Sequence, residues 1–390
     1  MVEQYSLKLP KAVYSGLNAL DQLVPIIKGK YYKAVIFTDK GIQGAGLLAP
    51  VLDRLEKCQV ELEIIDDLPA EPDYHQVQKV VDQFKNMRAD LIIAVGGGSV
   101  MDTAKLASVT AEGWYGIQQL LEEPLLGQKR VDTVMIPTTA GTGAEATPNA
   151  IVAVPEQEVK VGIVNPDMIA DYVILDGEMI RDLPKKIGAA TGIDALAHAV
   201  ECYTSNKANP FSNLFALEAL KLIFANLEKA CMNPEAVEEK TNMLRAAFYA
   251  GIAITSSGTT AVHALSYPLG GKYHIAHGVA NAILLLPVMR FNKPACLREF
   301  GEIYDALGED KTAKTLEEKG DWVLNRMAQM IRNLEIPTTL TEWGVGMEDL
   351  EELTKSGLEV KRLLNNNKRE ITYEDARRLY LQIMEGGDKK

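Results

Sequence analysis

Histidine is rare in this 390-residue chain, and its few copies are concentrated in one stretch. Only five histidines occur, and four of them lie between positions 198 and 277. In the helical run 189–203, Asp194 and His198 are four positions apart, so on a helix both side chains project from one face, about one turn from each other. That geometry allows a carboxylate and an imidazole to bind the same ion.

Further histidines extend this candidate metal site. His263 lies in an apolar segment of small residues, and His274 and His277 flank a turn that ends in Gly278. Three imidazoles and one carboxylate form a mixed nitrogen and oxygen donor set, which suits Fe(II) or Zn(II) and does not resemble a calcium site. A single buried histidine is more often hydrogen-bonded within a core. It is the clustering that favours a metal centre.

A glycine cluster predicts a phosphate-binding site. The strand-like run 91–95 leads directly into Gly96-Gly97-Gly98-Ser99, and a helix with Asp102 in its first turn follows. Glycines let the backbone approach a phosphate, and a helix N-terminus presents free N–H groups. The pattern is not G-x-G-x-x-G, because Met101 stands in place of the last glycine. It also follows the third predicted strand instead of the first, unlike the usual dinucleotide fingerprint.

A second loop of this kind ends the next predicted strand. Its sequence, Pro137-Thr138-Thr139-Ala140-Gly141-Thr142-Gly143, offers hydroxyl groups and mobile backbone. Each loop alone could be a tight turn, but together they favour a nucleotide pyrophosphate as ligand. Asp39 ends the first predicted strand, where a carboxylate could accept hydrogen bonds from a ribose and repel a 2′-phosphate, or could serve as a turn residue.

The elements that must position these residues form two parts. In the first half, β-branched runs alternate with helical periodicity, the pattern of a parallel sheet covered by helices. From about Asp182 onward strand-like runs almost vanish, and long amphipathic segments follow one another. The expected strands are 33–38, 60–65, 91–95, 133–136 and 172–175, and the expected helices are 44–57, 73–87, 100–111, 213–231 and 237–253.

This pattern predicts an α/β fold in two domains. An N-terminal domain over residues 1–183 would hold the parallel sheet and bind a nucleotide, and an all-helical domain over residues 184–390 would hold the metal. The boundary is placed at Leu183-Pro184 because proline disfavours helix continuation, and the last extended run has ended just before it.

Composition excludes several classes of protein. The chain is 47% hydrophobic and 24% charged, the balance of a soluble globular protein. Its net charge of -12 and lack of clustered Lys and Arg argue against nucleic acid as a partner. No apolar run reaches the length of a membrane span, and no signal segment is evident, so a cytoplasmic location is expected. The four cysteines lack a C-x-x-C pattern and indicate neither a disulfide framework nor a thiolate site.

Four motifs in this order resemble the iron-containing (group III) alcohol dehydrogenase family. They are GGGSVMD at 96–102, PTTAGTGAE at 137–145, GIDALAHA at 192–199 and HGVANA at 277–282. The similarity extends over nearly the whole chain, through Pro337-Thr338-Thr339-Leu340. The resemblance implies a dehydroquinate synthase-like architecture, an NAD(H) cofactor, a divalent metal and a homo-oligomer.

The resemblance also assigns roles to individual residues. The family's ligands for Fe(II), or Zn(II) as the alternative, match Asp194, His198, His263 and His277. Its cofactor contacts match Asp39, Gly97, Gly98, Ser99, Asp102, Thr138, Thr139, Thr142 and Lys160. Asp39 occupies the position that faces the adenine ribose in NAD-preferring members.

One position departs from the family pattern. Many members carry a second histidine four residues after the third ligand, where it is often assigned to proton relay, and this chain has Tyr267 there. A phenol has an unperturbed pKa of about 10 and is a poor base at neutral pH. The proton route is therefore open, and His274 either takes part in it or is a surface residue.

The activity implied is that of a metal-dependent alcohol dehydrogenase or aldehyde reductase, with His263, His277 and Tyr267 at the reacting centre. The ion would act as a Lewis acid on the substrate oxygen, and the nicotinamide would exchange a hydride. Asn149 stands where the family often has an aromatic residue, so short primary alcohols or aldehydes, including those with a polar or anionic tail, are expected substrates.

Two alternatives to this reading stay open. One is another member of the superfamily, similar to glycerol dehydrogenases or dehydroquinate synthases, and the Asp-x-x-x-His helix and the PTTAGTGAE run disfavour it. The other is a nucleotide-binding sensor without catalysis. Retention of all four ligand positions argues against the sensor.

Overall fold

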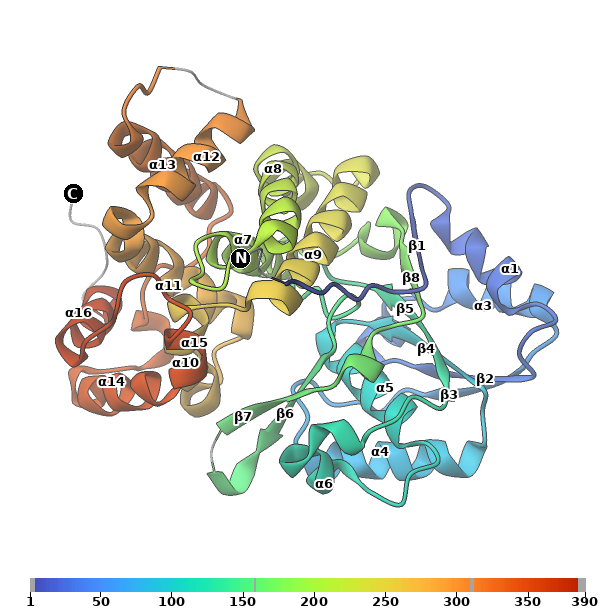
Figure 1. Ribbon diagram of the computed structural model, residues 1–390. Helices are drawn as coiled ribbons and strands as arrows, with labels where there is room; N and C mark the ends of the chain where they lie inside the picture. The colour runs from blue at the N-terminus through green and yellow to red at the C-terminus, as the bar shows by residue number, and fades with distance from the viewer. Residues whose placement is uncertain (1–3, 158, 309–311, 385–390) are drawn as a thin grey trace. The chain divides into compact units, whose positions relative to one another are not determined.

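The computed structural model describes residues 4–157, 159–308 and 312–384 (Figure 1). It divides into two compact units, which we call the sheet unit and the helical unit. The sheet unit contains Lys8–Leu183 and Pro234–Gly251, and the helical unit contains Pro184–Asn233, Ile252–Lys390 and a short N-terminal stretch up to Leu7. The sequence did not indicate that the chain returns to the sheet unit after residue 233, and the domain extents 1–183 and 184–390 stay a prediction.

The sheet unit is built on six parallel strands in the order β1-β8-β5-β4-β2-β3. All residues of β4 are buried, which explains the continuous apolar run that identified it in the sequence. The strands are β1 Ala12–Ser15, β2 Lys33–Phe37, β3 Glu61–Ile65, β4 Leu91–Gly96, β5 Asp132–Pro137 and β8 Tyr172–Leu175. The expected parallel sheet is confirmed, with strand ends displaced by at most one residue.

Three strands were missed by the sequence analysis. One is the four-residue strand β1, and the other two, β6 Asn149–Val154 and β7 Val159–Val164, pair antiparallel as a separate hairpin. Ile151 and Val159 of this hairpin remain partly exposed. The sequences of β6, NAIVAV, and β7, VKVGIV, are strongly apolar, so they contained a strand signal that was not used.

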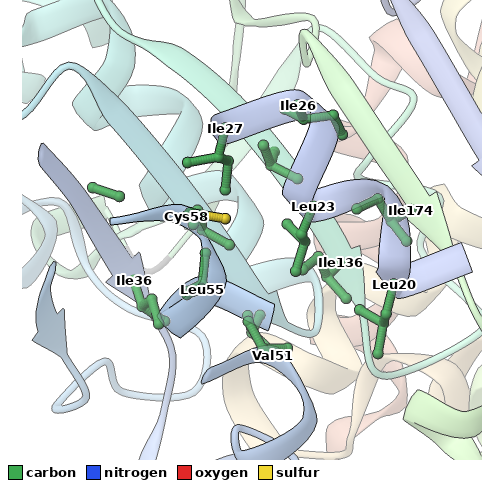
Figure 2. Close-up of a cluster of buried hydrophobic side chains, with 14 of the residues drawn as sticks. Leu20, Leu23, Ile26, Ile27, Ile36, Val51, Leu55, Cys58, Ile136 and Ile174 are labelled. Atoms are coloured by element: carbon green, nitrogen blue, oxygen red, sulfur yellow. The ribbon is translucent and has the colours of Figure 1, made fainter. Parts of the chain in front are cut away.

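Helices cover both faces of the sheet because alternate side chains of a strand point to opposite faces. Ile36 of β2 belongs to a buried cluster with Leu23 and Val51 (Figure 2), whereas the next residue, Phe37, contacts Phe84 with ring centroids 5.5 Å apart. The helices are α1 Leu23–Ile27, α2 Lys40–Gly44, α3 Ala49–Leu55, α4 Tyr74–Met87, α5 Gly98–Thr110 and α6 Ile117–Glu122. Helices α1 and α3 therefore cover one face, and α4 covers the other.

The single helix expected over 44–57 is wrong in detail. Helix α2 ends at Gly44, where the expected helix was to begin, and only α3, Ala49–Leu55, lies within the expected range. Gly46 between them has φ +74, a left-handed conformation that ends a helix, and Pro50 stands in the first turn of α3.

The helical unit contains no β-strand among its described residues. Its helices are α7 Lys185–Tyr203, α8 Pro210–Met232, the end of α9 Val237–Ser257, α10 Ala261–Tyr273, α11 His277–Asn292, α12 Leu297–Leu307, α13 Leu316–Asn333, α14 Leu350–Glu359, α15 Lys361–Leu364 and α16 Tyr373–Met384. A Cβ at Gly192 of α7 would lie 2.2 Å from Leu227 Cδ1 of α8, so glycine permits the close approach of these helices. Within the described part of the chain, no helix combines the length and apolar character that a membrane span requires.

Candidate functional site

The helical unit brings the expected metal ligands together. One ligand atom from each of Asp194, His198, His263 and His277 lies within 4.8 Å of the others. Asp194 and His198 project from α7, His263 comes from α10, and His277 is the first residue of α11. The first three side chains are buried, and that of His277 is 34% exposed. His274, by contrast, is exposed at the C-terminal end of α10 and lies outside the cluster.

The distances within the cluster leave room for an ion. Oδ1 of Asp194 lies 3.7 Å from Nε2 of His263 and 3.7 Å from Nε2 of His277. Both separations exceed those of hydrogen bonds. Acceptor atoms that face one another at this spacing repel unless a cation or a donor lies between them. We therefore take the four side chains as a candidate divalent-metal site.

The charges of the cluster are coupled. Burial opposes ionisation of Asp194, but the neighbouring imidazoles outweigh it and hold the pKa of the carboxyl well below its ordinary value. Burial lowers the pKa of His198 to about 4. Burial also opposes protonation of His263, yet the carboxylates of Glu201 and Asp194 raise its pKa above the ordinary value. The cluster thus stabilises positive charge beside Asp194, as a cation site must.

Asn281 of α11 shows where the ligand lone pairs converge. Its Nδ2 donates to Oδ1 of Asp194 at 2.7 Å and lies 3.1 Å from Nε2 of both His263 and His277. Its Oδ1 is buried and has no hydrogen-bond partner among the described residues. One amide nitrogen thus faces a carboxylate oxygen and two imidazole nitrogens, and this set of atoms fits a divalent cation at this point.

In the sheet unit, the two expected phosphate loops pack against each other. Gly97 is the N-cap of α5 and makes no side-chain cap bond, so the first N–H groups of the helix are suited to an anion. The backbone N–H of Thr138 donates to the carbonyl of Gly96 at 3.0 Å. A Cβ at Gly98 would lie 3.1 Å from Thr142 Cγ2. The Oγ1 atom of Thr138 is buried without a hydrogen-bond partner in the described chain.

Other expected cofactor residues lie around these loops. The backbone N–H of Glu71 donates to Ser99 Oγ at 3.0 Å, and the carboxylate of Glu71 pairs with Lys160 Nζ at 2.8 Å. Asp39 is the N-cap of α2 and accepts from the N–H of Ile42 at 2.9 Å. Asp39 therefore acts as a capping residue at a turn, one of the two roles expected for it. The contact of Asp39 with a ribose stays a prediction.

Asp102 is held by a buried lysine that the sequence analysis missed. Lys105 Nζ lies 3.1 Å from Asp102 Oδ1, and it donates to Thr147 Oγ1 at 3.1 Å and to the carbonyl of Asn149 at 2.7 Å. The other carboxylate oxygen of Asp102 accepts from the N–H of Ile151 at 2.9 Å. Lysine is seldom fully buried, so nothing in the sequence indicated that Lys105 lies in the interior. The contact of Asp102 with nicotinamide, like that of Thr139, stays a prediction.

Comparison with known proteins decides the family. A family model described as iron-containing alcohol dehydrogenase matches residues 10–177, and a model of the C-terminal part of the Fe-containing alcohol dehydrogenase family matches residues 188–384. The chain belongs to the iron-containing alcohol dehydrogenase family. It is therefore an alcohol oxidoreductase, as its relatives are.

Three relatives illustrate how far the similarity extends. Long-chain-alcohol dehydrogenase 1 of Geobacillus thermodenitrificans is 34% identical over 95% of this chain and 94% of its own length. The alcohol dehydrogenase from Oenococcus oeni has a TM-score of 0.91 at 29% identity, covering 97% of this chain and 100% of the relative. Sulfoacetaldehyde reductase from Bifidobacterium kashiwanohense, solved in complex with NAD+, has a TM-score of 0.88 at 25% identity, covering 99% and 100%.

Two residues at the candidate metal site of this alcohol dehydrogenase were not recognised from sequence. Glu201, on α7, is fully buried and contacts Nδ1 of His263. Asp194, His198 and Glu201 stand at positions i, i+4 and i+7, which share one helix face, so the spacing contained a signal for Glu201. The sequence contained no comparable signal for Asn281, because its contacts with the ligands depend on how α11 packs against α7 and α10.

Asn281→Ala is expected to increase the stabilisation that a metal gives this alcohol dehydrogenase. Without metal, the variant leaves the buried carboxylate of Asp194 without this donor, which costs roughly 1–3 kcal/mol. With metal, the ion satisfies the same carboxylate. The melting temperature should therefore fall mainly for the metal-free protein, measured by thermal unfolding with chelator and with added Zn²⁺. Asn292→Ala is the control, since Asn292 is buried and pairs with Asn367. An equal metal-induced shift in both variants would contradict the prediction.

Glu145 of the second loop is expected to give this enzyme a pH-dependent stability. Burial raises the pKa of Glu145 from 4.5 to about 7, so the folded protein binds the proton more tightly than the unfolded chain. The resulting stability is fully present below about pH 4.5 and is lost as the pH rises through 7, by about 3 kcal/mol. Glu145→Gln should remove this decrease of the free energy of unfolding with pH, measured by urea unfolding between pH 5 and 8. Glu112→Gln, at an exposed site, should keep it, and an unchanged slope in Glu145→Gln would refute the assignment.

Proposed function

We propose that this enzyme is an NAD(H)- and divalent-metal-dependent alcohol dehydrogenase that interconverts short primary alcohols and aldehydes. The observation that carries the proposal is the cluster of Asp194, His198, His263 and His277, whose ligand atoms lie within 4.8 Å of one another. When bound, the ion would polarise the substrate oxygen and the nicotinamide would supply or accept the hydride. Fe(II) is the proposed ion, with Zn(II) as the alternative, because the donor set accepts both.

Tyr267 is proposed to orient the substrate oxygen by donating a hydrogen bond. Its ring lies 6.2 Å from that of His277, measured between centroids. Burial raises the pKa of its hydroxyl above the ordinary value, so at neutral pH the phenol is a donor and does not serve as the base. The proton must therefore leave by another group or by water.

The sheet unit is proposed to bind NAD(H). The N-terminus of α5 at Gly97, Gly98 and Ser99 would hold the pyrophosphate, together with Thr138, Thr139, Thr142 and Lys160. Asp39 would accept bonds from the adenine ribose, which favours NAD over NADP, and Asp102 would contact the nicotinamide. The bound NAD+ in the Bifidobacterium relative supports this cofactor.

The substrate is proposed to be small and to include molecules with a polar or anionic tail. Two of the named relatives act on very different molecules, a long-chain alcohol and sulfoacetaldehyde. The polar residues Asn149 and Tyr267 favour the second kind of molecule. A homo-oligomer is also proposed, and light scattering on the purified protein would test it.

The test is a metal-dependent turnover assay. The protein is purified anaerobically, its metal content is measured, and NADH absorbance is followed with short alcohols, short aldehydes, a sulfonated aldehyde and a long-chain alcohol. We expect turnover that a chelator abolishes and that is faster on the short and polar members. A preparation that binds neither metal nor NADH would overturn the proposal, and preference for the long-chain alcohol would overturn its substrate part.

A further inference from the structure

Glu201 is a buried carboxylate for which the reaction proposed above has no use. It lies on α7, three residues after His198, and its side chain is 0% exposed. Every hydrogen bond described for its carboxylate reaches the start of α10. Oε1 accepts from the N–H of Thr260 at 3.0 Å, from Thr260 Oγ1 at 2.7 Å and from the N–H of Val262 at 2.8 Å. Oε2 faces Nδ1 of His263.

The first of these oxygens caps helix α10. Thr260 is the N-cap of α10, and its side chain makes no cap bond to the helix. The first N–H groups of a helix lack partners within it, and a negative charge near them is favourable. Oε1 of Glu201 supplies that partner and, with three short donor contacts, is fully engaged. Only Oε2 remains for His263.

The second oxygen determines which nitrogen of His263 carries a proton. An ionised carboxylate only accepts hydrogen bonds, so Nδ1 of His263 must be its donor. Nε2, on the opposite side of the ring, then faces Asp194 Oδ1 at 3.7 Å and is the nitrogen available to an ion. A histidine that binds a metal commonly donates its other N–H to a carboxylate, and loss of that partner weakens metal binding.

We propose that Glu201 is a positioning residue, which fixes the ring orientation and Nδ1-protonated form of His263 for metal binding while it caps α10. This inference rests on the proposed function, because it assumes that His263 binds the ion. It adds a residue outside the four ligands whose charge is required for metal affinity.

Glu201→Gln separates these roles because it keeps the shape of the side chain. The new amide has one oxygen and one NH₂ group. If the oxygen stays with the donors of Thr260 and Val262, the NH₂ group points at Nδ1 of His263, which then favours a proton on Nε2 and blocks the ion. The reverse orientation places NH₂ against three donors. Neither arrangement serves both roles.

The experiment compares full-length wild type, Glu201→Gln and Thr260→Val. The control removes a neutral donor to the same carboxylate and leaves its charge and its contact with His263. Zn²⁺ affinity is measured by competition with a chromophoric chelator, and melting temperature is measured without metal. Nitrogen-15 shifts of the imidazoles are recorded on Zn²⁺-loaded protein, where only five histidines contribute.

We expect Glu201→Gln to bind Zn²⁺ about 10–100-fold more weakly and to lose the Nδ1–H signal of His263, while Thr260→Val keeps wild-type affinity and that signal. Wild-type affinity in Glu201→Gln, with or without a lower melting temperature, would overturn the inference and leave the proposed function intact. No Zn²⁺ binding by wild type would instead overturn the proposed function. If Glu201→Gln does not fold, Glu201→Asp retains the charge but shortens the side chain, and wild-type Zn²⁺ affinity in that variant would overturn the inference.

Discussion

Replacing His198 or His263 by alanine should remove both the bound metal and turnover. Both side chains are buried among the candidate ligands, so water cannot readily replace the lost imidazole in the same geometry. A divalent cation contributes several kcal/mol to stabilising charge on the substrate oxygen. At about 1.4 kcal/mol per tenfold in rate, we expect kcat/KM to fall by at least about three orders of magnitude.

The measurement pairs metal content, by elemental analysis, with the rate of NADH consumption for each variant. His75→Ala is the matched control, because His75 is exposed, belongs to the sheet unit and pairs with Glu156. It should retain metal and activity. His274→Ala should also retain metal, since His274 lies outside the cluster. A His198 or His263 variant that keeps both metal and activity would remove these residues from the site.

The clustering of the four candidate metal ligands could be anticipated because two independent signals coincided. Asp194 and His198 have a spacing that is meaningful on any helix, and a rare residue type was concentrated nearby. His263, His274 and His277 were candidates from this clustering, and the resemblance assigned the ligand roles to His263 and His277. Sequence could not supply their supporting contacts. Those contacts depend on how α7, α10 and α11 pack, and that packing is a property of the folded unit.

The parallel sheet could be anticipated for a similar reason. Its inner strands are buried on both faces, and burial on both faces requires continuous apolar runs. The order of the strands in the sheet could not be predicted from these apolar runs, because the runs do not indicate which strands are neighbours. The hairpin of β6 and β7 forms a separate two-stranded sheet, and its apolar runs NAIVAV and VKVGIV were not recognised as strands although they contained that signal.

Buried charge was the least predictable feature. Lys105, Glu145 and Glu201 are all essentially inaccessible to solvent, although each is of a type that is usually exposed. From sequence alone, a charged residue is predicted to lie on the surface unless its partner is known. The partners of Glu201 on α10 lie far along the chain, and Lys105 has its ion-pair partner, Asp102, three residues away but also bonds the distant carbonyl of Asn149.

Lys105→Met should destabilise the sheet unit by about 3–5 kcal/mol, the typical cost of breaking a buried ion pair. Methionine can fill the space of the lysine stem, so the loss is mainly one of charge. Lys105 has a 0% exposed side chain and reaches Asp102 at 3.1 Å. Its removal leaves Asp102 as a buried carboxylate without its cation. The free energy of unfolding is measured in urea at neutral pH.

The double variant Lys105→Met/Asp102→Asn separates charge from packing. It removes the carboxylate together with its partner, so it should recover a large part of the loss. Burial raises the pKa of Asp102, and the charge of Lys105 opposes that rise. In Lys105→Met the opposition is gone, so protonation of Asp102 at lower pH should reduce the deficit. A double variant no more stable than Lys105→Met, with a pH-independent deficit, would mean that Lys105 acts through its bonds to Thr147 and Asn149 alone.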